Sequence, residues 1–338
     1  MSPLDRRTFL TRSLITAGAG GAGLGAGLTA SDASAEAPSA TEQAHTVLCD
    51  ELATRIAFDG PHQAGILTPP QDQMTMLALD SIAPNGVVLF ETLQALSGQA
   101  RRLTQGDAVG VSEVDDPPPD SGILGAYDSP DGLTVTVAFG AALFDDRYGL
   151  ARLRPKGLVA MPDFLGDDID PARSGGDVLV QVCANHRDTV VHTVRELLRA
   201  TAGRLAVRWT LDGFQSTARG PAPRSSKRNL FAFRDGTANP DVRDDALMNR
   251  LLWLAPGSGE PRWATGGTYQ VVRTTRMHVE FWDRVGMLEQ EQMIGRYRVS
   301  GAPLGGEREF QDPDYPSDPD GRRIKLDANI RLANPRTP

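Results

Sequence analysis

The sequence predicts an α+β protein in which helices cover one face of an antiparallel sheet, and two observations lead to this fold class. Four segments show the alternation or the short apolar runs of half-buried strands. They are residues 74–82, 133–140, 177–184 and 204–214. Two further segments, residues 86–106 and 185–203, repeat apolar residues at helical spacing and end at glycine. The order along the chain is therefore β-α-β-β-α-β, which is that of a ferredoxin-like unit.

Local signals support the individual elements. The third element reads LTVTVAFG over residues 133–140 and alternates apolar and polar residues along most of its length. The second helix has Asn185 as its predicted N-cap and Gly203 at its predicted end. Cys183 closes an apolar run, and neither it nor Cys49 lies in a CxxC or a metal-spaced cluster. We therefore expect Cys183 to be a buried thiol.

The second half of the sequence predicts a second ferredoxin-like unit that is incomplete in this chain. A turn-rich connection, residues 215–240, leads to residues 267–282, whose β-branched and aromatic residues predict a long strand. Residues 284–296 predict a helix, and residues 297–338 are rich in Pro, Asp and Gly. The predicted domains are an export signal (1–35), a first ferredoxin-like unit with an N-terminal lead (36–214), and a linker with a partial second unit (215–338).

The composition argues against some classes of binding partner. The 338 residues carry a formal net charge of −8, with 23% charged and 40% hydrophobic residues. Such a chain has no global basic field. A nucleic acid or an anionic membrane surface is therefore not an expected main partner.

The first 35 residues have the order of a twin-arginine export signal. Arg6 and Arg7 precede an uncharged stretch, residues 14–31, and the small-x-small site Ala33-Ser34-Ala35 follows. A membrane anchor is the alternative, but glycine and alanine make this stretch weakly hydrophobic. We expect export to the periplasm, the cell envelope or the extracellular space. Because this route carries folded proteins, it also indicates a protein loaded with a cofactor.

Residues 233–240, FRDGTANP, are the densest local signal in the chain. Asp-Gly followed by Asn-Pro is typical of turns, which is the structural interpretation. In the functional interpretation, glycine and small residues let the backbone approach a flat ligand, over which Asp235 projects its carboxylate. Residue spacing alone leaves both interpretations open.

From about residue 60 onward the chain resembles the dye-decolorizing (DyP-type) peroxidases, most closely their exported deferrochelatase/peroxidase branch, which is associated with iron uptake. RDGTANP corresponds to the GxxDG-type motif of that family in its GFKDGT form. The other matching stretches are HQAGILTP, DSGILGAY, LFDDRYGL, GDVLVQVCAN, VEFWDR, GAPLGG and IRLANPR. Their number and common order make the resemblance specific.

This resemblance implies haem b held between two ferredoxin-like units of the dimeric α+β barrel type. The family aspartate that matches Asp235 lies on the peroxide side of the iron, where it takes a proton from H2O2 and returns it to the leaving oxygen. An aspartate in water has a pKa of about 3.9, so such a base still works in acid. The positions that match haem contacts are Gly236, Thr237, Ala238, Asn334, Pro335 and Arg336. A guanidinium such as that of Arg336 can pair with a haem propionate.

The chain departs from the family pattern at the iron and at its end. Asn329 stands where the family has the histidine that binds the iron, and an amide oxygen is a weaker donor than imidazole. The sequence as given also stops before the family's distal arginine and the remaining strands of the second unit. The five histidines, none of which has spacing that aims it at a haem, are His45, His62, His186, His192 and His278. The four tryptophans, expected to pack rather than to relay electrons, are Trp209, Trp253, Trp263 and Trp282.

The resemblance implies an enzyme, a haem-dependent peroxidase that uses H2O2 to oxidise dyes or other small organic donors, with a link to iron release from haem. The alternative is a catalytically impaired or non-catalytic remnant that binds haem or iron. A structural protein of the cell envelope has only the export signal in its favour. The expected partners are H2O2, small organic donors, iron-uptake components and a second copy of the chain.

Overall fold

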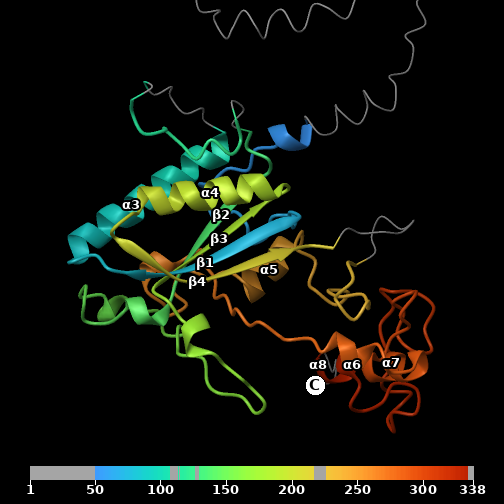
Figure 1. The fold of residues 1–338 in the computed structure, drawn as a ribbon. Helices are drawn as coiled ribbons and strands as arrows, with labels where there is room; N and C mark the ends of the chain where they lie inside the picture. Colours follow the sequence, from blue (N-terminus) through green and yellow to red (C-terminus); the bar gives the residue numbers. More distant parts are fainter. Residues whose placement is uncertain (1–49, 107–112, 114, 126–128, 217–225, 334–338) are drawn as a thin grey trace, which may run out of the picture. The chain divides into compact units, whose positions relative to one another are not determined.

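The structure, a computed structural model, describes residues 50–106, 113, 115–125, 129–216 and 226–333. Its one named sheet within these ranges has four antiparallel strands in the order β2-β3-β1-β4 (Figure 1). The strands are β1 (Gln73–Ser81), β2 (Thr134–Phe139), β3 (Val178–Ala184) and β4 (Leu205–Phe214). The long helices α3 (Gly86–Gln105) and α4 (Arg187–Ala200) lie on one face of this sheet. The predicted α+β class and the first ferredoxin-like unit are confirmed.

The main core lies between the sheet and the two long helices. Leu77 of β1 pairs with Val180 of β3, and both are almost fully buried together with Leu96 of α3 and Leu197 of α4. Full burial of such a side chain contributes about 1.5–3 kcal/mol. Cys183 belongs to β3 and is a buried free thiol, as predicted, and burial raises its pKa.

Helix α3 begins and ends on local signals. The side chain of Asn85 accepts a hydrogen bond from the backbone N–H of Val88 at 3.0 Å, which satisfies one free donor of the first turn. Gly106 ends the helix with a φ of 66°, and its N–H donates to Leu103 O.

Helix α4 begins at a different residue from the predicted one. Its N-cap is His186 rather than Asn185, and no side chain of the cap itself bonds the first turn. Asp131, fully buried and 55 residues away in sequence, contacts the N-cap residue and a first-turn side chain instead. Its Oδ2 accepts hydrogen bonds from His186 N at 2.9 Å and from Thr189 Oγ1 at 2.8 Å. The helix ends at Ala200, with Thr201 as the C-cap, ahead of the predicted Gly203.

The long strand predicted at residues 267–282 is wrong. Residues 267–278 belong to no strand in the part of the chain that the structure describes, and Val279–Trp282 form helix α6. Single contacts to other segments replace a ladder, for example the N–H of Gly157 donating to the hydroxyl of Tyr269 at 3.0 Å. β-Branched residues favour a strand only where a partner strand is available.

The helix predicted at residues 284–296 is α7 (Met287–Ile294), which ends at Gly295. The remaining elements of the described residues are short. They include η1 (Ala141–Leu143), η2 (Ala151–Leu153), η3 (Pro171–Arg173), α5 (Asp245–Leu251), η4 (Arg262–Ala264) and α8 (Asn329–Ala333). In the ranges described, no helix is long and apolar enough to cross a membrane.

The Asp131–His186 pair predicts a pH-dependent stability. The hydrogen bond to Asp131 raises the pKa of His186, and the two side-chain atoms lie 2.8 Å apart. Because the folded-state pKa lies above the unfolded value of about 6.5, this contribution is fully present below that pH and is lost as the pH rises through the folded-state pKa. We expect Tm to fall more between pH 6 and pH 9 for the wild type than for His186→Gln. Parallel Tm curves for the two proteins would contradict this account.

Candidate functional site

Residues 226–240, here called the Asp235 loop, fold back on themselves as an irregular hairpin. Arg228 and Arg234 form an isolated antiparallel bridge. The N–H of Asp235 donates to Lys227 O at 2.9 Å, and the N–H of Asn229 donates to Phe233 O at 3.0 Å. The tip is strained, because Ala232 has a φ of 65° without being glycine. The predicted turn is therefore present, and it fixes the backbone on both sides of Asp235.

Asn229 connects the tip of this loop to the Asp235 side chain. Its Oδ1 accepts hydrogen bonds from Phe231 N at 3.0 Å and Phe233 N at 3.3 Å, and its Nδ2 donates to Asp235 Oδ2 at 3.3 Å. Asp235 itself is exposed. The candidate catalytic carboxylate is thus accessible to a ligand while one of its oxygens is held by an amide.

The three residues after Asp235 differ in what fixes them. Gly236 has a φ of 82°, and a Cβ there would lie 3.1 Å from the side chain of Asn239, so glycine suits this position. Thr237 Oγ1 lies 3.3 Å from both Ser226 Oγ and Glu309 Oε1. Ala238 is exposed. These small residues leave the backbone open to a ligand, as the functional interpretation requires.

A buried carboxylate, which the sequence interpretation missed, contacts the loop from a distant segment. Glu309 is 9% exposed and accepts a hydrogen bond from Ser226 N at 2.9 Å. Its Oε2 lies 3.8 Å from Nε of Arg234, whose side chain is also largely buried. Burial and the neighbouring cations Arg234 and Arg298 lower the pKa of Arg228. No local sequence signal marks Glu309, since the partners of its carboxylate lie 72 or more residues away.

A cavity of about 390 Å³ adjoins the loop at Phe231. Trp282 is 9% exposed and stacks on Phe231 with ring centroids 4.5 Å apart, which confirms it as a packing residue. The cavity is lined mainly by aromatic, methionine and aliphatic side chains. Its lining residues are Phe231, Thr275, Arg276, Met277, His278, Phe281, Trp282, Val285 and Met293.

Asn329, the predicted metal position, is the exposed first residue of α8. The helix packs on α7, and Ile330 contacts the small buried cluster of Tyr315, Ile324 and Ala328. Among the described residues, no hydrogen bond or ion pair joins Asn329 to the Asp235 loop. The predicted haem contacts Asn334, Pro335 and Arg336 lie outside the described residues.

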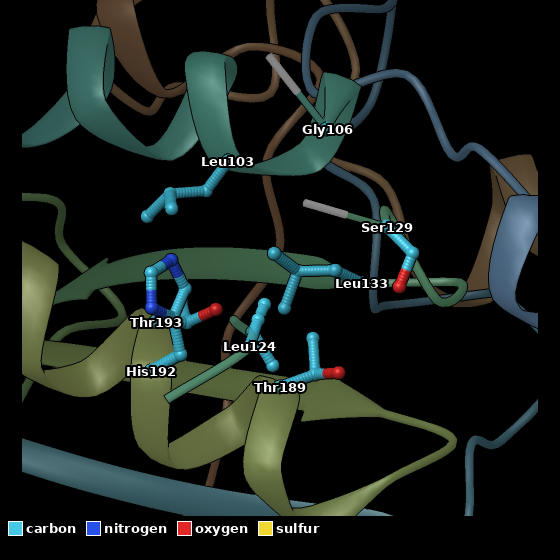
Figure 2. A pocket seen from close by; sticks show the side chains of 8 residues that line it. All are labelled: Leu103, Gly106, Leu124, Ser129, Leu133, Thr189, His192 and Thr193. Carbon is cyan, nitrogen blue, oxygen red and sulfur yellow. The ribbon is translucent and has the colours of Figure 1, made fainter. Parts of the chain in front are cut away.

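The histidines of the described residues have other partners. His62 stacks on Trp253 with centroids 3.7 Å apart, and His186 pairs with Asp131. His192 is buried, and its Nδ1 lies 2.6 Å from Ser121 Oγ. Figure 2 shows the His192 ring beside a cavity between α3 and α4, but its volume of about 10 Å³ admits no more than a water molecule. His278 is exposed at the cavity beside Phe231, and His45 lies outside the described residues.

Gly301 lies against the buried side chains of Arg234 and Glu309, so a side chain added there tests how closely these two charged groups pack. Its φ is 76°, and a Cβ there would lie 2.6 Å from Cγ of Arg234 and 3.1 Å from Cγ of Glu309. Gly122 has a similar φ of 66° but open space around it, which makes it a matched control. Both alanine variants carry the backbone cost of roughly 1–2 kcal/mol. We expect urea unfolding to show an additional loss of about 1–3 kcal/mol for Gly301→Ala only. Equal losses would show that the close approach does not matter.

Comparison with known proteins identifies the family. The Dyp-type peroxidase N-terminal model matches residues 63–215, and the C-terminal model matches residues 226–338. The deferrochelatase of Escherichia coli (strain K12) is 46% identical over 282 residues, covering 83% of this chain and 67% of the relative. The deferrochelatase of Yersinia pseudotuberculosis serotype I (strain IP32953) is 42% identical over 338 residues, covering 100% of this chain and 76% of the relative.

Solved structures agree. A DyP-type peroxidase from Cellulomonas bogoriensis superposes with a TM-score of 0.74 at 36% identity, over 85% of this chain and 76% of the other. One from Streptomyces coelicolor gives a TM-score of 0.75 at 31% identity, with the same coverage. The chain therefore belongs to the dye-decolorizing (DyP-type) peroxidase family.

Proposed function

We propose that this protein is a haem-dependent peroxidase that uses H2O2 to oxidise small organic donors. The observation that carries the proposal is Asp235, an exposed carboxylate whose flanking backbone and one oxygen are fixed by hydrogen bonds. A general acid–base group must be accessible and held in place, and both conditions are met here. Family membership supports the reaction type, since the relatives are peroxidases by name.

The acid–base chemistry of Asp235 needs two proton transfers. The carboxylate would accept a proton from one oxygen of H2O2 and, as the acid, return it to the other oxygen, while a bound haem would supply the two electrons that O–O cleavage requires. Asn229 Nδ2 donates a hydrogen bond to Oδ2, which leaves the other oxygen, Oδ1, for these proton transfers. The cavity at Phe231, about 390 Å³, lies within the size range of small-molecule sites, roughly 300–1,000 Å³. Its apolar walls suit a small organic donor.

Of the residues predicted to contact haem, the small residues after Asp235 fit the cofactor and Asn329 does not. Haem is the cofactor of DyP-type peroxidases, and a bound haem supplies the iron at which peroxide is split. The open backbone of Gly236, Thr237 and Ala238 fits contact with such a flat group. Asn329 does not fit the ligand position, because an amide oxygen is a weaker iron donor than imidazole. Within the described ranges there is also no cluster of three His, Cys, Asp or Glu side chains that could hold a metal ion.

Asn329 is also the specific observation that favours a second candidate function, a catalytically impaired or non-catalytic member of the family that binds haem or iron. The curated relatives are named deferrochelatase, so release of iron from haem belongs to the proposal as well. Asn334, Pro335 and Arg336 remain proposed haem contacts.

We further propose export by the twin-arginine route, supported by Arg6 and Arg7 in the sequence. Iron-uptake components and a second copy of the chain remain proposed partners.

Loss of the Asp235 carboxylate tests the main proposal. With haemin bound, as followed by the Soret band, we expect Asp235→Asn to lower kcat/KM for H2O2 by roughly 10²–10⁴-fold, the usual contribution of general acid–base catalysis. Asp163→Asn is the control, because Asp163 is also exposed and lies outside the loop. If wild type binds no haemin at micromolar concentration, or if both variants match the wild type, the proposal is wrong.

Replacing Asn329 separates the two candidate functions. Imidazole is the stronger donor, so Asn329→His is expected to tighten haemin binding by roughly 10–100-fold, in line with the effect of single ligand-shell changes. Peroxidase turnover that appears only in the variant favours the impaired member. Dye oxidation by the unmodified chain, measured with H2O2, favours the active enzyme and excludes the impaired one.

A further inference from the structure

We propose that Glu309 is a positioning residue for Asp235. Its buried carboxylate fixes the Asp235 loop from a segment more than 70 residues later in the sequence. The proposal rests on the proposed function, because it concerns how the same acid–base group is oriented.

The contacts of Glu309 lie on both sides of Asp235 in the sequence. Oε1 accepts hydrogen bonds from Ser226 N at 2.9 Å and from Thr237 Oγ1 at 3.3 Å. Oε2 lies 3.8 Å from Nε of Arg234, the residue next to Asp235. One carboxylate thus joins the first residue of the loop to both sequence neighbours of the Asp-Gly pair.

A short path of hydrogen bonds leads from Glu309 to the backbone of Asp235. Glu309 holds Ser226, and the carbonyl of the following residue, Lys227, accepts the N–H of Asp235 at 2.9 Å. Arg234 strengthens this path, because its guanidinium donates to Ser226 O at 2.5 Å. A shift of Ser226 would therefore move the acceptor that orients Asp235.

Glu309 cannot adjust freely, because its own backbone is held from the other side. Arg296, which is 5% exposed, donates from Nη1 to Glu309 O at 2.8 Å and to Gly301 O at 2.7 Å. Gly301 leaves no room for a side chain between Arg234 and Glu309. The carboxylate is the anionic member of this buried group, and its loss would leave the Arg234 guanidinium without compensation.

The test compares Glu309→Gln, which keeps the shape but removes the charge, with Glu307→Gln, an exposed glutamate two residues away. The first readout needs no cofactor: trypsin cleavage after Arg228 and Arg234, located by mass spectrometry and compared with cleavage after Arg208 in β4. We expect Glu309→Gln to speed cleavage at the two loop sites by about ten-fold or more, because the hydrogen bonds lose their charged acceptor and Arg234 loses its anionic partner. Cleavage in β4 and all sites of Glu307→Gln should match the wild type.

The second readout tests positioning against a merely structural role. In haemin-loaded protein, Glu309→Gln should lower kcat/KM for H2O2 by about ten-fold or more and leave KM for the organic donor unchanged. In the Asp235→Asn background the same substitution should cause no further loss. An equal loss in both backgrounds, or loop cleavage unchanged from the wild type, would overturn the proposal.

The two readouts distinguish failure of the proposed peroxidase function from failure of the proposed role of Glu309. If the wild type shows no peroxidase activity, the proposed function fails, and the cleavage rates still decide whether Glu309 holds the loop. If Glu309→Gln does not fold, Thr237→Val removes one of the same hydrogen bonds and must speed loop cleavage by several-fold. Wild-type cleavage in that variant would overturn the proposal.

Discussion

The contact between a buried carboxylate and the Asp235 loop is the interaction on which the candidate site depends. Glu309 joins the start of the loop to Thr237 and approaches the largely buried guanidinium of Arg234. A half-satisfied buried charge would destabilise this region, so the hydrogen bonds from Ser226 and Thr237 matter as much as the ion pair. The strained φ of Ala232 can persist because the surrounding contacts determine the loop so fully.

The four-stranded sheet with α3 and α4 forms a core that needs no contribution from this charge cluster. Its stability comes from buried aliphatic side chains, for example Leu77 against Val180. Asp131, in a turn ahead of β2, adds a polar connection, because it accepts hydrogen bonds from the N-cap backbone and from a first-turn hydroxyl of α4. Different interactions therefore stabilise the two parts of the chain. Hydrophobic burial stabilises the sheet with its helices, and buried polar contacts stabilise the Asp235 loop.

The parts of the fold that sequence predicts well are those with local causes. Asn85 and Gly106 limit α3 through contacts within a few residues, and the alternation at 134–139 gives β2. The sequence does not identify His186 as the N-cap of α4, because the acceptor of its backbone N–H, Asp131, lies far away in sequence. Residues 267–278 have strand-like composition, but strand formation depends on a partner, which composition does not specify.

The candidate site also contains residues that the sequence predicts and residues that it does not. Asp235 was found by resemblance to a family motif, whereas its spacing also fitted an ordinary turn, and the structure contains that turn. Glu309 and Asn229 could not be found, because one acts across 72 or more residues and the other is a common turn residue. Asn329 is a departure from the family pattern, which the sequence shows, whereas its place as the exposed first residue of α8 comes only from the structure.

The most direct test of the central claim, that the exposed Asp235 carboxylate sits on a fixed backbone, is amide hydrogen exchange of the unmodified protein. The N–H groups of Ser226 and Asp235 are hydrogen-bonded to Glu309 and Lys227, so they should exchange at least about 100-fold more slowly than unstructured amides. Exchange of these two amides as fast as that of the exposed residue Asp163 would contradict the account.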